Sequence, residues 1–241
     1  MLTFAEKISL ITMYKGFITP IEVPQSKVEI THDCPLLLMG SCFAESIGAR
    51  LAENKFTCDI NPFGILYNPL SIAEAIHRML DGRRYEESSP ELIEYQGQWH
   101  SLMHHGYFSA DSRKACVEGI NFRLLKGGEM LRKARVVLIT FGTAYVYHHR
   151  EINRIVGNCH KLPERTFTRR RLDVEQIVAE YIALVGQIAK VNPDIHFVFT
   201  VSPIRHLRDG LHANQVSKAT LLLAIEKLVE ALPDKCSYFP A

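Results

Sequence analysis

A serine placed directly after a short apolar run has the surroundings that a nucleophile needs. Ser41 follows Gly40 and the apolar residues 36–39, and a helical pattern begins at Phe43. A strand, a glycine turn and a serine at a helix entrance put one hydroxyl at the carboxyl edge of a sheet. Backbone N–H groups at the helix start then face the group that this hydroxyl attacks. We interpret Ser41 as a candidate nucleophile; a helix N-cap serine is the alternative at the same position.

The next residue is a second candidate for the same chemistry. Cys42 carries a thiol at the predicted helix N-terminus, where the pKa of a thiol can be lowered. A small, buried space-filling residue is the other interpretation of Cys42, and it is the one that we favour. Separate substitutions, Ser41→Ala and Cys42→Ser, would distinguish the two nucleophiles.

Histidines offer a different class of chemistry. His100, His104 and His105 lie close together, and His160 follows another short strand. Three imidazoles and a carboxylate can hold Zn²⁺ and activate water. However, His100 and His104 fall in a predicted hairpin rather than a helix, and no H-E-x-x-H signature occurs. A metal hydrolase is therefore a minor alternative, and polar loop residues are the ordinary interpretation of these histidines.

The order of predicted elements positions these groups. Apolar runs alternate with amphipathic helical patterns, which indicates βαβ units and a parallel sheet. The predicted strands are 36–39, 57–60, 136–141, 196–201 and 236–239, and the predicted helices are about 43–55, 69–80, 111–134, 173–191 and 215–232. Two hairpins are predicted over 92–103 and 145–156. The expected fold class is α/β, a three-layer α/β/α sandwich with a mostly parallel sheet and a small β-hairpin insertion.

This fold brings distant segments together. Ligands of such sheets bind beyond the carboxyl ends of the strands. Ser41, Gly142 and the segment 202–206 all follow predicted strands, so we expect them to meet at one edge of the sheet. The inserted hairpin, with Trp99 and its neighbouring aromatic residues, could cover a pocket there or pack onto the sheet.

Composition sets further limits. The chain has 241 residues, 47% of them hydrophobic and 22% charged, with a net charge of +2, as in soluble globular proteins that bind neither nucleic acid nor a membrane. Six cysteines include no C-x-x-C pair, which favours free thiols in a reducing cytoplasm. We expect a tail or extension over 1–15 and a single domain over 16–241. A basic run over 165–171 is a solvated loop or a contact for an anionic group.

Five separated motifs carry a resemblance. They are G-S-C-F-A at 40–44, N-P-F-G-I-L-Y-N-P at 61–69, T-F-G-T-A-Y at 140–145, N-C-H-K-L-P at 158–163 and T-V-S-P-I-R-H at 200–206. In type and order they resemble the GSCFA family, which is related to the SGNH (GDSL-like) ester hydrolases. The likeness covers roughly residue 16 to the end of the chain.

The resemblance implies an oxyanion site beside Ser41. Gly142 and Thr143 resemble the glycine-containing oxyanion block of SGNH enzymes, in which an asparagine follows the glycine. Here Thr143-Ala144 stands in that place, so the asparagine donor is missing. Thr143, backbone amides or Asn68 from another loop are the expected substitutes, and an ordinary strand-to-loop turn is the alternative.

The resemblance also suggests a base. Asp209 and His212 have the D-x-x-H spacing of an SGNH acid–histidine pair, but they precede a strong helix and a further strand, whereas the family pair follows the last strand. The family chain continues beyond the match at 238–240 with another D-x-x-H-P segment, so we expect a C-terminally truncated chain whose family acid and base lie beyond residue 241. Asp209 and His212 are then the catalytic pair, residues that line the site, or an exposed helix entry.

Together these features predict a serine esterase or acyltransferase for a small-molecule or glycan ester, cytoplasmic and without a cofactor. A non-catalytic domain that binds an acyl or carbohydrate group is the alternative. Besides the catalytic residues, the predicted substrate and oxyanion contacts are Gly40, Cys42, Asn68, Gly142, Thr143, His104, His160 and His206.

Overall fold

A parallel sheet forms the centre of the molecule. The computed structural model describes residues 26, 28–205 and 207–240; the predicted tail over 1–15 lies outside them. The sheet has the order β10-β9-β5-β1-β2, and all paired neighbours run parallel. Its strands are β1 (Leu36–Gly40), β2 (Cys58–Ile60), β5 (Val136–Phe141), β9 (His196–Val201) and β10 (Cys236–Tyr238).

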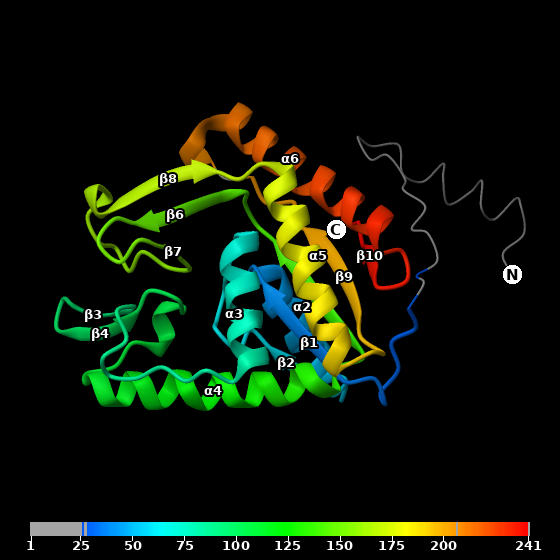
Figure 1. Cartoon of the computed structure of the whole chain (residues 1–241), viewed down its shortest axis with the longest axis horizontal. Coiled ribbons are helices and arrows are strands. Elements are labelled where there is room, and N and C mark those ends of the chain that lie inside the picture. Colours follow the sequence, from blue (N-terminus) through cyan, green and yellow to red (C-terminus); the bar gives the residue numbers. More distant parts are fainter. Residues whose placement is uncertain (1–25, 27, 206, 241) are drawn as a thin grey trace, which may run out of the picture.

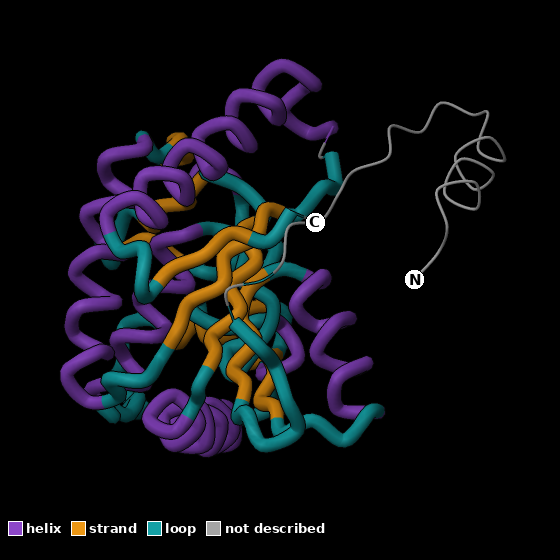
Figure 2. Tube along the Cα trace, turned by 90° about the vertical axis from the view of Figure 1, so that its right-hand side faces the viewer, coloured by secondary structure: helices purple, strands orange, loops and turns teal. Residues whose placement is uncertain are grey.

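Helices cover both faces of this sheet (Figure 2). They are α2 (Cys42–Glu53), α3 (Pro69–Asp81), α4 (Arg113–Lys133), α5 (Val174–Val191) and α6 (Gly210–Ala231). Side chains alternate between the faces along a strand. In β1, Leu36 and Leu38 therefore pack with Ala44 of α2, whereas Leu37 and Met39 pack in the larger core cluster with the other helices. The three-layer α/β/α prediction is confirmed.

Two smaller sheets lie beside the central one (Figure 1). The hairpin β3 (Leu92–Tyr95) and β4 (Gln98–Ser101) is antiparallel, as predicted. A second sheet has the order β7-β6-β8 and contains β6 (Tyr145–His149), β7 (Arg154–Val156) and β8 (Phe167–Arg171). Residues 167–171 of the basic run thus form an edge strand, and the solvated-loop interpretation was wrong for them, because backbone pairing with β6, not charge, decides their structure.

Local sequence explains where the main helices begin. The side chains of Ser41, Asn68, Ser112 and Asp173 accept hydrogen bonds from the first turns of α2, α3, α4 and α5. Such caps satisfy N–H groups that have no partner inside the helix. Short 3₁₀ turns are η1 (Gly106–Phe108), η2 (Glu164–Thr166) and η3 (Leu207–Asp209).

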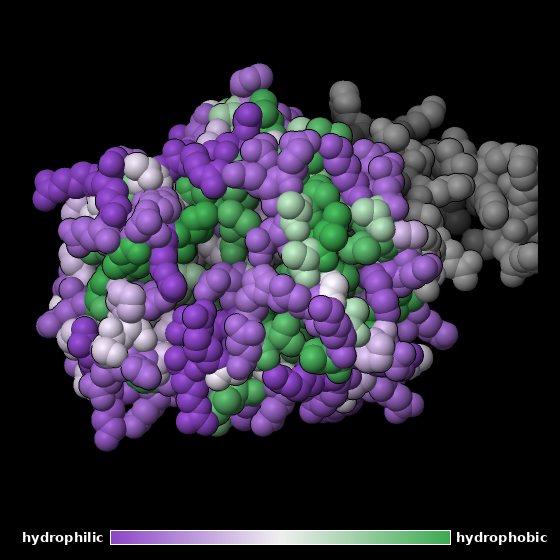
Figure 3. Space-filling view, viewed as in Figure 1, coloured by the Kyte–Doolittle hydropathy of each residue, from purple (hydrophilic) through white to green (hydrophobic). Residues whose placement is uncertain are grey.

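The surface is mainly hydrophilic, with separate hydrophobic patches on the face drawn in Figure 3. All six cysteines are unpaired thiols. None of the helices in the described part of the chain combines the length and apolar composition that crossing a bilayer requires.

Candidate functional site

The corner between β1 and α2 is built around a glycine. Gly40 has φ of 129°, and a Cβ there would lie 2.2 Å from the carbonyl oxygen of Thr140. Only glycine fits this approach. The chain then turns so that Ser41 N donates to Thr140 O at 3.1 Å, which fixes Ser41 beside the end of β5. Ser41 therefore stands at the carboxyl edge of the sheet, as its sequence position predicts.

The Ser41 hydroxyl serves as the α2 cap in this structure. Its Oγ accepts from Phe43 N at 3.3 Å, and the residue is 1% exposed. Among the described residues, this is the one hydrogen bond that the hydroxyl makes, and no histidine contacts it. Cys42, the first residue of α2, is half-buried. Ser41 thus lies at the position expected of a nucleophile, but the residue is buried.

An asparagine that the sequence interpretation did not single out supports this corner. Asn61 follows β2, and its Oδ1 accepts from Gly40 N at 2.9 Å. Its own N–H donates to Leu38 O at 2.8 Å. Asn61 is 3% exposed, yet within the described part of the chain its Nδ2 has no hydrogen-bond partner. A buried amide left unpaired costs about 1–3 kcal/mol.

The segment after Asn61 ties the corner to the end of β5. Leu66 N donates to Gly40 O at 3.0 Å, and Tyr67 O accepts from the amides of Gly142 at 2.7 Å and Thr143 at 3.0 Å. A Cβ on Gly142 would lie 2.8 Å from Tyr67 Cδ1, so the tyrosine packs directly on the glycine. The two amides expected at an oxyanion site are therefore already used.

Helix α6 fixes the same edge from the other side. Ser217 Oγ accepts from Ala144 N at 2.8 Å. Lys218 Nζ donates to Gly142 O at 2.6 Å and to Ser202 O at 2.7 Å, and so joins the ends of β5 and β9. Burial lowers the pKa of Lys218 to about 8. No sequence pattern distinguishes this lysine beyond its place in an amphipathic helix.

A groove lies along this edge, and we call it the tyrosine groove. It consists of two cavities of about 240 Å³ each that share Tyr67, Thr143, Tyr145 and Tyr147. One cavity continues to Arg169, Arg208, Asp209, Asn214 and Ser217. The other continues to Ile65, Asn68, His105, Val156, Gly157, Asn158 and Cys159. Aromatic faces beside amide and guanidinium groups can hold a ring that carries hydroxyl groups.

Asp209, the acidic member of the predicted acid–histidine pair, lies at one end of this groove. The Asp209 carboxylate accepts from Arg169 Nη2 at 2.6 Å, and the Arg169 guanidinium lies 3.9 Å from the centre of the Tyr145 ring. His212 is exposed on the first turn of α6. The Asp209 carboxylate is thus paired with Arg169 in this structure. His206 lies outside the described residues.

The predicted contact Asn68 has its side chain in use. Its Oδ1 accepts from Ser71 N at 2.8 Å, and its Nδ2 donates to Ser71 Oγ at 2.9 Å. The carboxamide caps α3, although the residue also borders the tyrosine groove.

Of the three histidines predicted as contacts, His104 is buried and His160 is half-buried. His104 is fully buried, stacks on Phe63 at 4.3 Å between ring centres, and has Nδ1 2.8 Å from Ser101 Oγ. Burial lowers the pKa of His104 well below its usual value and also lowers that of His160, whose Nε2 donates to Ser101 O at 2.7 Å. Within the described residues, no three His, Cys, Asp or Glu side chains are arranged to hold a metal ion.

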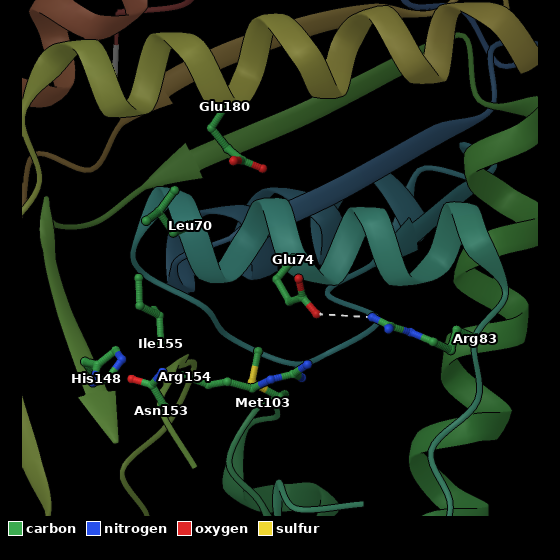
Figure 4. Close-up of a pocket in the computed structure, with 9 residues that line it drawn as sticks. All are labelled: Leu70, Glu74, Arg83, Met103, His148, Asn153, Arg154, Ile155 and Glu180. Atoms are coloured by element: carbon green, nitrogen blue, oxygen red, sulfur yellow. Dashed lines mark ion pairs between the residues drawn. The ribbon is translucent and has the colours of Figure 1, made fainter. Parts of the chain in front are cut away.

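A cavity of about 450 Å³, larger than either cavity of the tyrosine groove, lies elsewhere, among α3, α5 and the segment of β6 and β7 (Figure 4). Its ionised side chains are already neutralised by the pairs Glu74–Arg83, His77–Glu180 and Arg154–Glu91. A charged substrate would have to compete with these pairs. The carboxyl edge, with its unpaired amide and its hydroxyl, is chemically the better candidate site.

The fold and the corner define an α/β/α protein with a candidate serine site at the carboxyl edge of a parallel sheet. The model of the GSCFA family matches residues 35–241, and the chain belongs to this family. Searches of curated proteins and of solved structures gave no match.

Proposed function

We propose that this GSCFA-family chain is an SGNH-type serine ester hydrolase or acyltransferase, with Ser41 as its nucleophile. The observation that carries the proposal is the position of Ser41, between the end of β1 and the N-terminus of α2. Partial positive charge at a helix N-terminus favours an anion that develops beside it. The tyrosine groove at the same edge supports an ester with a sugar or aromatic group.

The reaction requires a proton acceptor for the Ser41 hydroxyl. His212 has a carboxylate, that of Asp209, three positions before it in the sequence. Asp209 borders the tyrosine groove. We assign His212 as the base and Asp209 as its orienting group. Because Arg169 holds Asp209 and Ser41 is 1% exposed, the pair and the hydroxyl come together only when substrate binding rearranges this edge.

A covalent label tests the nucleophile directly. A fluorophosphonate probe should phosphonylate Ser41, and peptide mass spectrometry should find the adduct on this residue. Ser41→Ala should abolish labelling, whereas Cys42→Ser should retain it. Adducts that persist in Ser41→Ala, or their absence from the unaltered chain, would overturn the proposal.

One observation favours a second function, the binding of an acyl or carbohydrate group without turnover. The amides of Ser41 and Gly142 already donate to Thr140 O and Tyr67 O, so neither is free for an oxyanion. Calorimetry with candidate glycans and acyl esters separates the functions. Saturable binding with no released acid or alcohol supports the binding domain, and product formation excludes it.

A further inference from the structure

The unpaired amide of Asn61 stands next to the proposed nucleophile. Its side chain is hydrogen-bonded to Gly40, the residue directly before Ser41, and is 3% exposed. Its Nδ2 has no hydrogen-bond partner among the residues that the structure describes. We propose that Asn61 is a catalytic residue whose Nδ2–H group donates to the oxyanion formed when Ser41 attacks an ester. This inference rests on the proposed serine-esterase function.

The orientation of this carboxamide follows from its neighbours. The N–H group of Gly40 can only donate, so the atom that faces it must be Oδ1, and Nδ2 must be the atom without a partner. The backbone of Asn61 is equally constrained. Its carbonyl oxygen accepts from Gly64 N at 2.7 Å and from the Tyr107 hydroxyl at 3.3 Å.

Its left-handed backbone, with φ of 44°, is a conformation that asparagine tolerates better than most residues. The donor is therefore held in place before any substrate arrives, which is the condition for electrostatic stabilisation of a transition state.

Other expected donors at this edge are engaged. Ser41 N donates to Thr140 O, Gly142 N donates to Tyr67 O, and the Asn68 carboxamide caps α3. Asn61 differs from all three, because it can donate to a new acceptor without giving up an existing hydrogen bond. A group of this kind stabilises the transition state more than the ground state, since the ester oxygen gains charge only during attack.

The step is a simple addition. The bond from Ser41 Oγ to the acyl carbon forms, the carbonyl π electrons move to the oxygen, and the Oγ proton passes to the base. Asn61 donates a hydrogen bond to the resulting oxyanion and transfers no proton. When the oxyanion collapses, the ester C–O bond breaks and the leaving alcohol takes the proton from the base.

Asn61→Asp is the sharpest substitution. The carboxylate keeps an acceptor for Gly40 N but replaces the donor with a second acceptor. With p-nitrophenyl acetate as substrate, kcat should fall about 10²–10³-fold, the loss typical of an oxyanion donor, whereas KM should change less than about threefold. If the buried carboxylate prevents folding, Asn61→Gly also removes the donor and accommodates a φ of 44°, although it removes the acceptor of Gly40 N as well.

Asn192→Asp is the matched control. Asn192 is also buried, but its Nδ2 donates to Leu131 O at 3.1 Å and to Ala134 O at 2.8 Å. Losing both bonds should lower the midpoint of denaturation and leave kcat of the folded protein unchanged. A loss of kcat in Asn61→Asp no larger than that in Asn192→Asp would overturn the role of Asn61.

A second measurement separates this inference from the function on which it rests. In protein with ¹⁵N-labelled asparagine, the Asn61 side-chain N–H signals should shift downfield when a phosphonate adduct forms on Ser41. An adduct without this shift overturns the Asn61 role and leaves the nucleophile intact. A chain that neither hydrolyses the ester nor accepts the phosphonate overturns both.

Discussion

Gly48→Ala tests how tightly the helix that carries Ser41 is packed on the sheet. Gly48 lies on the buried face of α2, against Ile60 at the end of β2. A Cβ at this position would lie 2.7 Å from Cγ1, 2.8 Å from Cδ1 and 3.0 Å from Cγ2 of Ile60. All three distances are shorter than ordinary contacts, so either the isoleucine or the helix must move.

Two opposing effects determine how much Gly48→Ala changes the free energy of unfolding. Alanine in a helix interior is favoured over glycine by about 1 kcal/mol. Overpacking a filled core costs about 1–3 kcal/mol, and β-branched Ile60 has little freedom at χ1 to turn aside. Gly48→Ala should therefore lower the free energy of unfolding by about 0–2 kcal/mol. Gly186→Ala in α5 should raise it by about 1 kcal/mol, because nothing lies within 4 Å of that added Cβ.

Urea denaturation of the three proteins measures both values, and the midpoints should fall in the order Gly186→Ala, unaltered chain, Gly48→Ala. A displaced α2 should also slow fluorophosphonate labelling of Ser41, since α2 begins at the next residue. If Gly48→Ala were as stabilising as Gly186→Ala, the contact between α2 and Ile60 would not be tight and the reasoning would fail.

Two ion pairs give further predictions. The hydrogen bond that His77 Nε2 donates to Glu180 Oε1 raises the pKa of His77, and the same bond lowers the pKa of Glu180. The pair should therefore stabilise the fold by about 0.5 kcal/mol between pH 5 and 6.5. This contribution should disappear as the pH rises through the raised pKa of His77. A difference in unfolding free energy between the unaltered chain and His77→Gln that does not change with pH would contradict this prediction. Glu91, 2% exposed, contacts Arg78 at 3.6 Å and also Arg154. Glu91→Gln should cost about 3–5 kcal/mol in thermal or urea unfolding, and a cost below 1 kcal/mol would show that the two guanidinium groups find other partners.

Most of the fold follows from the sequence because hydrophobic periodicity and helix caps agree. The strands predicted over 136–141 and 196–201 are β5 and β9, residue for residue, and the other three sheet strands each differ by one residue at an end. The start of α6 is different: its N-terminal residues 210–214 lack an apolar pattern, and the helix begins five residues earlier than predicted. Strand β8 has four exposed residues after Phe167, so nothing in its composition distinguishes it from a loop.

The site could be predicted only in part. The turn of Gly40 and the helix entrance at Ser41 are local features, and they lie where the sequence indicates. The roles of Asn61 and Lys218 depend on hydrogen bonds to residues 21 and 76 positions away. Such long-range partners leave no spacing signal in one sequence.

The occupied amides constrain any mechanism at this corner. Gly142 N and Thr143 N have one hydrogen each, and both donate to Tyr67 O. An oxyanion held by these amides would displace the tyrosine carbonyl, so the gain would be an exchange of acceptors rather than a new hydrogen bond. Asn61 Nδ2 requires no exchange, because none of the described residues accepts a hydrogen bond from it. The carboxamide that Thr143-Ala144 does not provide at the end of β5 is therefore present at the end of β2, on the opposite side of Ser41 in the sheet order.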